Sequence, residues 1–431
     1  MSPTSSSLIA PESVRGSGLS GACWTAIRRL MKCSHGHQLF FLGACVGWLA
    51  WRAEDGIAQL AWIVMLPIAW RAAQSRWAAA ALMAGYYFAG ARGLIVGAGV
   101  FFGDGGGFGR GLFLWGAACL LLTAPYLLIW SADARKKPWA FLCAMAVSMV
   151  PPLAIIGWLH PLAIAGVFFP GLGWIGLGLT VCLLTVLAAG YLRGILAFCT
   201  MAFACNSMAV FTDPKPAPAW VGVDTNFSAL SSGGAGDAGR LLATMERVQW
   251  IKQFAATIPA GQVWVLPETV AGVFDILSEY DLAKTEADLR ARRARLIVGA
   301  EVPQADGRYK NVLIVLGSAD AQEAHDTRFL VQNVPVPISM WKPWSDNGAV
   351  GNLFGRENVG TVAGLRVAAS ICYEQLLAYS WLWTMQEKPD VLIAVNNLWW
   401  ARNTSLPNIM LQNTISFGRL FYVRVVVSRN G

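Results

Sequence analysis

The residue best placed for chemistry in this sequence is a cysteine at the end of a short apolar run. Residues 366–371 are typical of a buried strand, and the run stops at Cys372 before a helical pattern begins at Leu376. A corner between a strand and a helix can hold a nucleophile clear of the backbone, with amide groups nearby to receive an oxyanion. A lone cysteine is also often a small buried hydrophobic residue, and position alone leaves both interpretations open.

Cys372 is the only cysteine after residue 211 of the 431-residue chain. The other eight lie in the N-terminal tail or the apolar first half, at Cys23, Cys33, Cys45, Cys119, Cys143, Cys182, Cys199 and Cys205. With no second thiol in its own half of the chain, we expect Cys372 to form no disulfide even in an oxidising compartment. Its thiol would then be free to act as a nucleophile.

A glutamate follows a second apolar run. Residues 262–266 are again typical of a strand, Pro267 ends the strand's hydrogen bonding, and Glu268 comes next. Taken alone, Glu268 would more often be a surface acid or an acid at a helix N-terminus. Paired with Cys372 it is better explained as a general base, because a thiol with a reference pKa of about 8.5 needs one to stay nucleophilic at neutral pH.

The composition divides the chain into two halves. Charged residues make up only 13%, mean hydropathy is +0.48 and there are 20 tryptophans, which is too apolar for an ordinary soluble protein. Residues 1–211 hold 13 Lys and Arg against 5 Asp and Glu, whereas residues 212–431 hold 20 of each. The whole net charge of +8 belongs to the first half, and the neutral second half offers no basic face for nucleic acid.

The first half predicts a membrane domain. A Ser- and Gly-rich basic tail at 1–37 precedes residues 38–211, whose apolar segments mostly approach the roughly 20 residues that cross a bilayer. Seven such segments lie at 38–51, 57–70, 77–101, 111–130, 139–157, 170–190 and 194–211. Ten basic residues fall on one side of these spans and two on the other, which predicts a cytoplasmic N-terminus. An odd number of spans then places residue 212 onward outside the cytoplasm.

The second half predicts one α/β domain at 219–431, joined to the first by a Pro-rich linker at 212–218. Candidate strands lie at 219–224, 262–266, 295–300, 311–317, 366–371, 390–396 and 422–428. Candidate helices lie at 239–258, 273–293, 375–387 and 406–420. Glu268 and Cys372 therefore each follow a strand of the same domain.

Four segments of the second half resemble the nitrilase superfamily, and within it the apolipoprotein N-acyltransferases. Residues 266–269 (Leu-Pro-Glu-Thr) look like that family's catalytic-acid segment, and residues 371–374 (Ile-Cys-Tyr-Glu) are similar to its nucleophile segment. Residues 396–400 and 424–431 resemble two later segments. A single match of this length is weak evidence for a family. Four such matches in the family's order, after an apolar N-terminal half, form a specific pattern.

This resemblance implies a polytopic α-helical membrane domain in the bacterial inner membrane, followed by a nitrilase-like αββα sandwich on the periplasmic side. It also implies acyl transfer. Cys372 would attack an acyl carbonyl, with a membrane phospholipid as the expected donor, and would form a thioester while Glu268 moves the proton. The acceptor would be an amine of unknown identity, Tyr373 and Glu374 would contact the substrate, and no cofactor or metal is implied.

Tryptophans near these segments have two interpretations. Trp341 and Trp344 could belong to the core, as could Trp399 and Trp400. Beside an active site that faces a bilayer, they could instead form an interfacial belt that admits acyl chains, and we favour this second interpretation.

The lysine of that family's Glu-Lys-Cys triad has no clear counterpart here. Residues 329–337 align best with the family's lysine segment, and they place the lysine's position at Leu330 or Gln332. Lys342 is the nearest substitute for a positive charge on the oxyanion, while Lys310 is expected at a strand edge. With these departures the chain resembles the plasmid conjugal-transfer proteins of this architecture more than a housekeeping acyltransferase.

A rival interpretation is a non-catalytic membrane component of a conjugation or envelope apparatus, with other proteins of that apparatus as partners. A transporter is less well supported, because the apolar segments carry few ionisable residues and no evident repeat. Neither a zinc site nor Ser-His-Asp catalysis is supported in the second half, because His325 is its only histidine. The sequence ends at Gly431, before the last strands and final helix expected of the acyltransferases, so we expect a shortened relative or a fragment.

Overall fold

The computed structural model describes residues 36–52, 56–101, 107–212, 219–227, 237–318, 327–340 and 348–431. Most of the predicted tail and linker lie outside these ranges. Trp341, Lys342, Trp344 and His325 also lie outside them.

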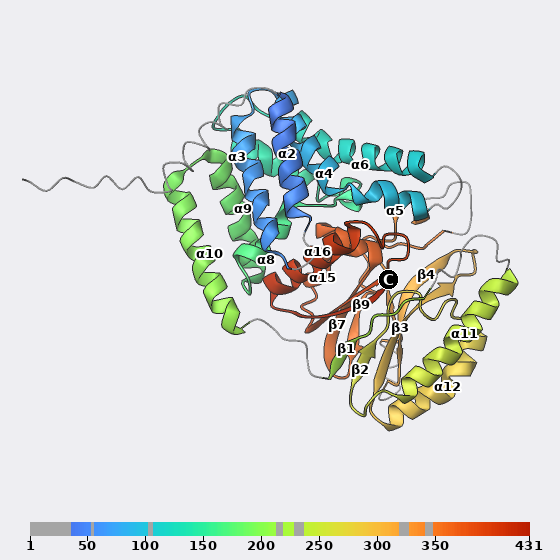
Figure 1. The fold of residues 1–431 in the computed structure, drawn as a ribbon. Helices are drawn as coiled ribbons and strands as arrows, with labels where there is room; N and C mark the ends of the chain where they lie inside the picture. The colour runs from blue at the N-terminus through green and yellow to red at the C-terminus, as the bar shows by residue number, and fades with distance from the viewer. Residues whose placement is uncertain are drawn as a thin grey trace, which may run out of the picture.

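The described part of the first half is helical. Its elements are α2 Gly36–Ala50, η1 Ala58–Val64, α3 Met65–Ala72, α4 Arg76–Gly90, α5 Gly93–Phe101, α6 Gly107–Ile129, α7 Lys137–Val147, η2 Leu153–Ile156, η3 Pro161–Ile164, α8 Ala165–Phe168, α9 Gly173–Ala189 and α10 Leu192–Thr212. Helices lie at each of the seven predicted apolar segments. In Figure 1 they gather in the upper and left part of the molecule, above and beside the sheets.

Fewer of the described helices are long and apolar enough to cross a bilayer than the sequence predicts. Within the described ranges, α6 and α10 are long and apolar enough to cross a membrane. The pair α4 and α5, bent by 53°, and the pair Pro161–Phe168 and α9, bent by 118°, would bring the number to four. Residues 36–50, 58–72 and 137–147 form shorter apolar helices, so seven crossings stay a prediction.

Glycines let α2 and α4 pack with their backbones close together. A Cβ placed on Gly43 would lie 1.9 Å from the Leu82 carbonyl oxygen, and one on Gly47 would lie 2.2 Å from the Tyr86 carbonyl oxygen. Gly43 and Gly47 are four residues apart, the small-residue spacing by which membrane helices approach each other. This contact gives the first half a rigid pair of helices.

Nine strands form two sheets in the described part of the second half. One sheet has the order β1 Trp220–Gly222, β2 Val263–Val265, β3 Arg295–Pro303, β4 Tyr309–Leu316 and β5 Phe329–Val331. The other has the order β6 Val359–Val362, β7 Leu365–Ile371, β8 Val391–Asn397 and β9 Arg424–Asn430. The strands β1 to β3 are parallel, as are β7 to β9, while β4, β5 and β6 pair antiparallel with their neighbours. All seven predicted strands are present, and β5 and β6 are additional.

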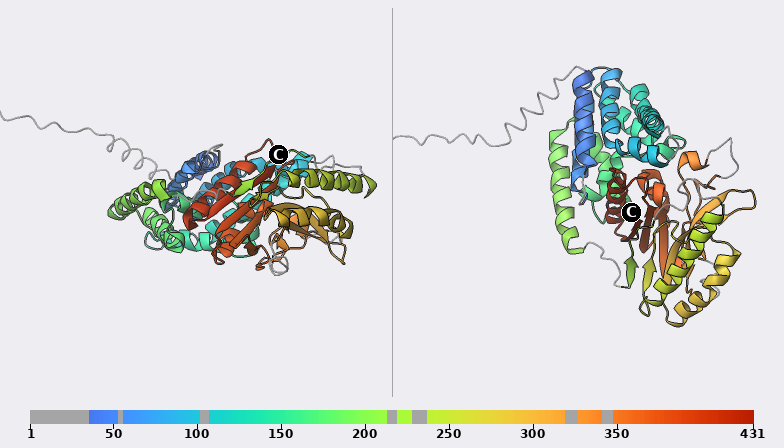
Figure 2. Two further views of the ribbon diagram at one scale, coloured as in Figure 1. Left: turned by 90° about the horizontal axis from the view of Figure 1, so that it is seen from below. Right: turned by 45° about the vertical axis from the view of Figure 1, so that its right-hand side comes forward.

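The two sheets pack face to face between two layers of helices, which is the predicted αββα order. The core between the sheets contains apolar side chains of both, among them Val265, Ile297, Leu313, Val367, Ile393 and Val395. Helices α11 Asp237–Ala256 and α12 Ile276–Ala291 cover the outer face of the first sheet. Helices α15 Ala378–Met385 and α16 Leu406–Phe421 cover the second. Figures 1 and 2 show α11 and α12 on the side away from the first half.

Helix α16 joins the two halves. A Cβ on Gly166 of α8 would lie 1.9 Å from the Ser416 carbonyl oxygen, and the Ser416 hydroxyl donates a hydrogen bond of 2.5 Å to the Ala163 carbonyl. Leu406, Ile409 and Met410 of α16 belong to one apolar core with side chains of α2 to α7. The second sheet is therefore fixed against the helical half.

Candidate active site

Cys372 lies at the corner that the sequence predicts. Strand β7 ends at Ile371, and Cys372 begins the short 3-10 helix η4 Cys372–Leu376. The backbone of Cys372 has φ +53°, a left-handed conformation that costs free energy for a side chain with a Cβ and is most often found at functional sites. The side chain is 7% exposed, so the thiol is held at the sheet edge and shielded from bulk water.

Glu268 faces this thiol from the other sheet. Asn311 Nδ2 donates a hydrogen bond of 2.6 Å to Glu268 Oε1, and the Asn397 backbone N–H donates one of 2.7 Å to Oε2. The third hydrogen-bond partner of the carboxyl is the Cys372 thiol. The structure thus brings together the two residues that the sequence singled out, 104 positions apart.

Burial shapes the chemistry of this pair. It raises the pKa of Glu268 to about 7, which the hydrogen bonds from Cys372, Asn311 and Asn397 partly oppose. Burial and the neighbouring Glu268 also raise the pKa of the Cys372 thiol well above its ordinary value. At neutral pH the cysteine therefore carries its proton, and Glu268 is poised to accept it.

Gln332 is one of the two positions at which the family's lysine is expected. Its side chain is buried, its Nε2 donates a 2.7 Å hydrogen bond to the Ile371 carbonyl, and its Oε1 accepts one of 3.2 Å from Asn311 Nδ2. Leu330, the other aligned position, is buried in the core between the sheets. Lys310 lies near the start of β4 and pairs with Glu357 at 3.0 Å. Lys342 is outside the described residues, and its role stays a prediction.

Glu374 holds the backbone around the nucleophile. It is fully buried, and its Oε1 accepts hydrogen bonds of 2.7 and 2.9 Å from the backbone N–H groups of Asn333 and Val334. Its Oε2 accepts one of 2.9 Å from the Ile371 N–H. Both carboxyl oxygens accept hydrogen bonds from the protein backbone, so Glu374 holds the segment after β5 against the end of β7. Its predicted contact with substrate stays untested.

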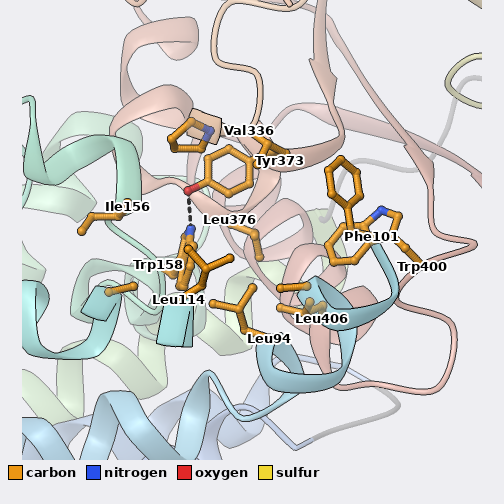
Figure 3. Close-up of a pocket in the computed structure, with 13 residues that line it drawn as sticks. Leu94, Phe101, Leu114, Ile156, Trp158, Val336, Tyr373, Leu376, Trp400 and Leu406 are labelled. Carbon is orange, nitrogen blue, oxygen red and sulfur yellow. Dashed lines mark hydrogen bonds between the residues drawn. The ribbon is translucent and has the colours of Figure 1, made fainter. Parts of the chain in front are cut away.

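Tyr373 connects the nucleophile turn to the first half. Its hydroxyl donates a 2.7 Å hydrogen bond to the Ile155 carbonyl and accepts one of 2.7 Å from Trp158 Nε1. The Tyr373 ring also lines an apolar cavity of about 140 Å³ (Figure 3). The lining includes Leu94, Phe101 and Leu114 of the first half and Tyr373, Leu376 and Trp400 of the second.

The predicted tryptophans divide between this cavity and the core. Trp400 lines the cavity and packs edge-on against Phe101 with ring centroids 5.6 Å apart. Trp399 is partly buried against the apolar core shared by both halves. Trp341 lies outside the described residues.

A buried amide network fixes the backbone N–H that binds Glu268. Asn397 Nδ2 donates a 2.6 Å hydrogen bond to Thr269 Oγ1, and its Oδ1 accepts one of 2.9 Å from Asn430 Nδ2. Asn430 in turn binds Thr225 and the backbone of Phe227. Its two asparagines lie in two of the segments that resemble the nitrilase superfamily, and Thr269 lies in a third.

Comparison with known proteins identifies the family. The chain is 32% identical to the conjugal transfer protein TraB of Agrobacterium fabrum strain C58 over 411 residues, covering 91% of this chain and 92% of that protein. It is 33% identical to the probable conjugal transfer protein TraB of Sinorhizobium fredii strain NBRC 101917 over 396 residues, covering 89% and 95% respectively. The chain belongs to the TraB family of conjugal transfer proteins.

The solved structures similar to this TraB-family chain include an amidase described as a member of the nitrilase superfamily. One is an amidase from Nesterenkonia sp. AN1 with acetamide bound covalently at its active-site cysteine. It is 13% identical, covers 49% of this chain and 74% of the amidase chain, and has a TM-score of 0.32. Another structure of the amidase has a TM-score of 0.31 at 13% identity and the same coverage. No protein-family profile matches the chain.

Sequence reasoning missed Asn311 and the support that Asn397 gives to Glu268. Asn311 directly precedes the apolar run of residues 312–316, and this place in the sequence was the available signal. Its side chain meets Glu268 because β2 and β4 both flank β3 in the first sheet, and the sequence does not record that strand order.

Proposed function

We propose that this TraB-family protein is a membrane-anchored acyltransferase that serves conjugal transfer. The observation that carries the proposal is the buried pair of Cys372 and Glu268, which lie just beyond the C-terminal ends of β7 and β2 in the two sheets. Asn311 and Asn397 hold the Glu268 carboxyl there by hydrogen bonds. A thiol paired with a base is the arrangement by which an acyl group is taken up as a thioester.

The proposed donor is a membrane phospholipid. The apolar cavity is lined by α5 and α6 as well as by Tyr373 and Leu376 of η4, so a hydrocarbon chain that enters from the helical half would reach the residue next to Cys372. Two to four helices of that half are long and apolar enough to cross a bilayer, which supports membrane anchoring. An amine or water would then release the acyl group from Cys372.

A phospholipid analogue with an alkyne-tagged acyl chain tests the proposal. The full-length protein in membranes should become labelled through a hydroxylamine-sensitive bond at Cys372, and Cys372→Ala should abolish the label. Labelling that persists in Cys372→Ala, or a wild-type protein that takes no label, would contradict acyl transfer at this residue.

A non-catalytic role in the conjugation apparatus is the second candidate, and the neutral side chains of Leu330 and Gln332, the two positions aligned with the family's lysine, favour it. Complementation of a deletion strain separates the two. Under the enzyme proposal, Cys372→Ala and Glu268→Gln at matched expression should lose conjugation efficiency, whereas a structural component would tolerate both. Full complementation by Cys372→Ala would exclude the enzyme as the basis of the biological role.

A further inference from the structure

The apolar cavity between the two halves suits a hydrocarbon ligand. Two polar groups on its wall are already bonded, because Trp158 Nε1 donates to the Tyr373 hydroxyl and that hydroxyl donates to the Ile155 carbonyl. Aliphatic and aromatic side chains make up the rest of the lining (Figure 3). A polar ligand would lose its hydrogen bonds to water there, whereas a hydrocarbon group would lose none.

The volume of the cavity limits how much hydrocarbon it can hold. An engineered apolar cavity of about 150 Å³ in another protein binds benzene. By that measure, a cavity of about 140 Å³ takes about six carbon atoms. The acyl chain of a membrane phospholipid is longer, so the rest of the chain would stay outside the cavity, among the lipids.

Two alanines leave this space open. Ala98 of α5 and Ala118 of α6 line the cavity, and both are buried, at 5% and 8% exposure. Their neighbours on the wall are large, among them Phe101, Leu114 and Trp400. The alanines are therefore the positions at which a side chain could grow into the cavity.

The helices that carry these alanines are held tightly in place. A Cβ on Gly97 of α5 would lie 2.9 Å from the Trp400 ring, and a Cβ on Gly111 of α6 would lie 2.0 Å from the Ile95 carbonyl oxygen of α5. Such close contacts leave little freedom for α5 or α6 to shift. A larger side chain in place of either alanine would therefore fill the cavity instead of moving its walls.

We propose that this cavity is the specificity pocket for the donor's acyl chain, that it holds about six carbons near the carbonyl end, and that Ala98 and Ala118 set its capacity. This assignment rests on the proposed acyl transfer and names the part of the donor that the protein reads. The order of the carbons follows from Tyr373, which lines the cavity and comes directly after Cys372. The carbonyl end therefore lies by the nucleophile, and the methyl end lies in the bilayer.

Photo-crosslinking tests the pocket without any acyl transfer. Full-length Cys372→Ala protein in nanodiscs receives phosphatidylglycerol with a diazirine at carbon 6 or at carbon 15 of the acyl chain, and adducts are mapped by mass spectrometry. We expect the carbon-6 probe to label the peptide that holds Tyr373 and Leu376, and the carbon-15 probe to leave it unlabelled. Adducts on the exposed Phe113 of α6 show that each probe has reacted.

A second substitution in the same background tests the capacity of the pocket. Ala118→Leu puts an isobutyl group where a methyl group stands, so about three carbons of the chain lose their place and the carbon-6 adduct should disappear. Gly116→Leu is the matched control on α6, because no atom lies within 4 Å of its added Cβ, and it should keep the adduct. Thermal melting checks that both variants are folded. The pocket is overturned if the carbon-6 probe gives no adduct on this peptide, if only the carbon-15 probe gives one, or if the carbon-6 adduct survives Ala118→Leu.

Chain length gives a further measure in protein that keeps Cys372. In p-nitrophenyl esters of straight-chain acids with 2 to 16 carbons, the sulfur bonds to the acyl carbon and p-nitrophenol leaves with the thiol proton. The ratio of the Ala118→Leu rate to the wild-type rate at each length cancels the partition of the ester into detergent. Because each buried methylene favours binding about fourfold, we expect a ratio near one for the shortest esters and at least about a tenfold loss for those beyond about eight carbons.

The two measurements separate the pocket from the reaction. A rate ratio that is the same at every chain length would overturn the role of Ala118. No acylation of Cys372 at any length, in a protein that gives the carbon-6 adduct, would contradict acyl transfer while supporting the pocket.

Discussion

Glu268 makes the stability of the protein depend on pH. Burial raises its pKa to about 7 in the folded protein, against about 4.3 in an unfolded chain. The folded state therefore binds the proton more tightly. Its stabilising contribution is complete below about pH 4 and is lost as the pH rises through 7. Glu374, whose pKa burial also raises to about 7, acts in the same direction. We expect the melting temperature to fall from pH 5 to pH 8, and to fall less in Glu268→Gln.

The matched control for this prediction is Glu357→Gln. Glu357 is an exposed partner of Lys310, so its removal should keep the wild-type slope of melting temperature against pH. Equal slopes in wild type and Glu268→Gln would show that the carboxyl titrates alike in the folded and unfolded states.

The nucleophile Cys372 and the base Glu268 could be predicted from the sequence, because each comes within two residues of the end of an apolar strand. The position of the family's lysine could be narrowed only to Leu330 or Gln332, because these two residues are two apart in an extended segment and point to the same side of it. The structure separates them, since Leu330 packs in the core between the sheets while Gln332 hydrogen-bonds to the Ile371 carbonyl and to Asn311. No local sequence pattern records that difference.

Helix α16 depends on a glycine of the first half for its contact. Gly166→Ala would place a methyl group where the Ser416 carbonyl lies, 1.9 Å away, so α8 and α16 would have to separate. We expect a loss of about 1–3 kcal/mol in stability, seen as a lower melting temperature in detergent. Gly178→Ala in α9 is the control, because no atom lies within 4 Å of its added Cβ and the melting temperature should hold or rise. Equal effects of the two substitutions would show that the close contact does not form.

The elements themselves were predictable to different degrees. Seven strands were predicted from largely apolar segments of five to seven residues, whereas β5 and β6 were not, although β1 and β2 are as short as β5. Apolar segments located the helices of the first half, but hydropathy does not show where a helix bends. Gly90 and Gly93 flank the bend between α4 and α5, which turns one predicted span into two helices.

For the whole molecule, the charge bias of the connections predicts that the C-terminal half faces the periplasm. Alkaline phosphatase fused after Gly431 should be active, and the same fusion placed after Lys136 should be inactive. An inactive fusion at Gly431 together with a fluorescent green-fluorescent-protein fusion at the same point would contradict this orientation.

The contact between α16 and α8 also has a genetic consequence. Its two sides, Ser416 in α16 and Gly166 in α8, are encoded 250 codons apart. A recombination event between two related genes anywhere in that interval would join an α16 from one parent to an α8 from the other. Because the backbones meet without room for a Cβ, few such hybrids would keep the fit. The close packing therefore favours inheritance of this gene as an undivided unit.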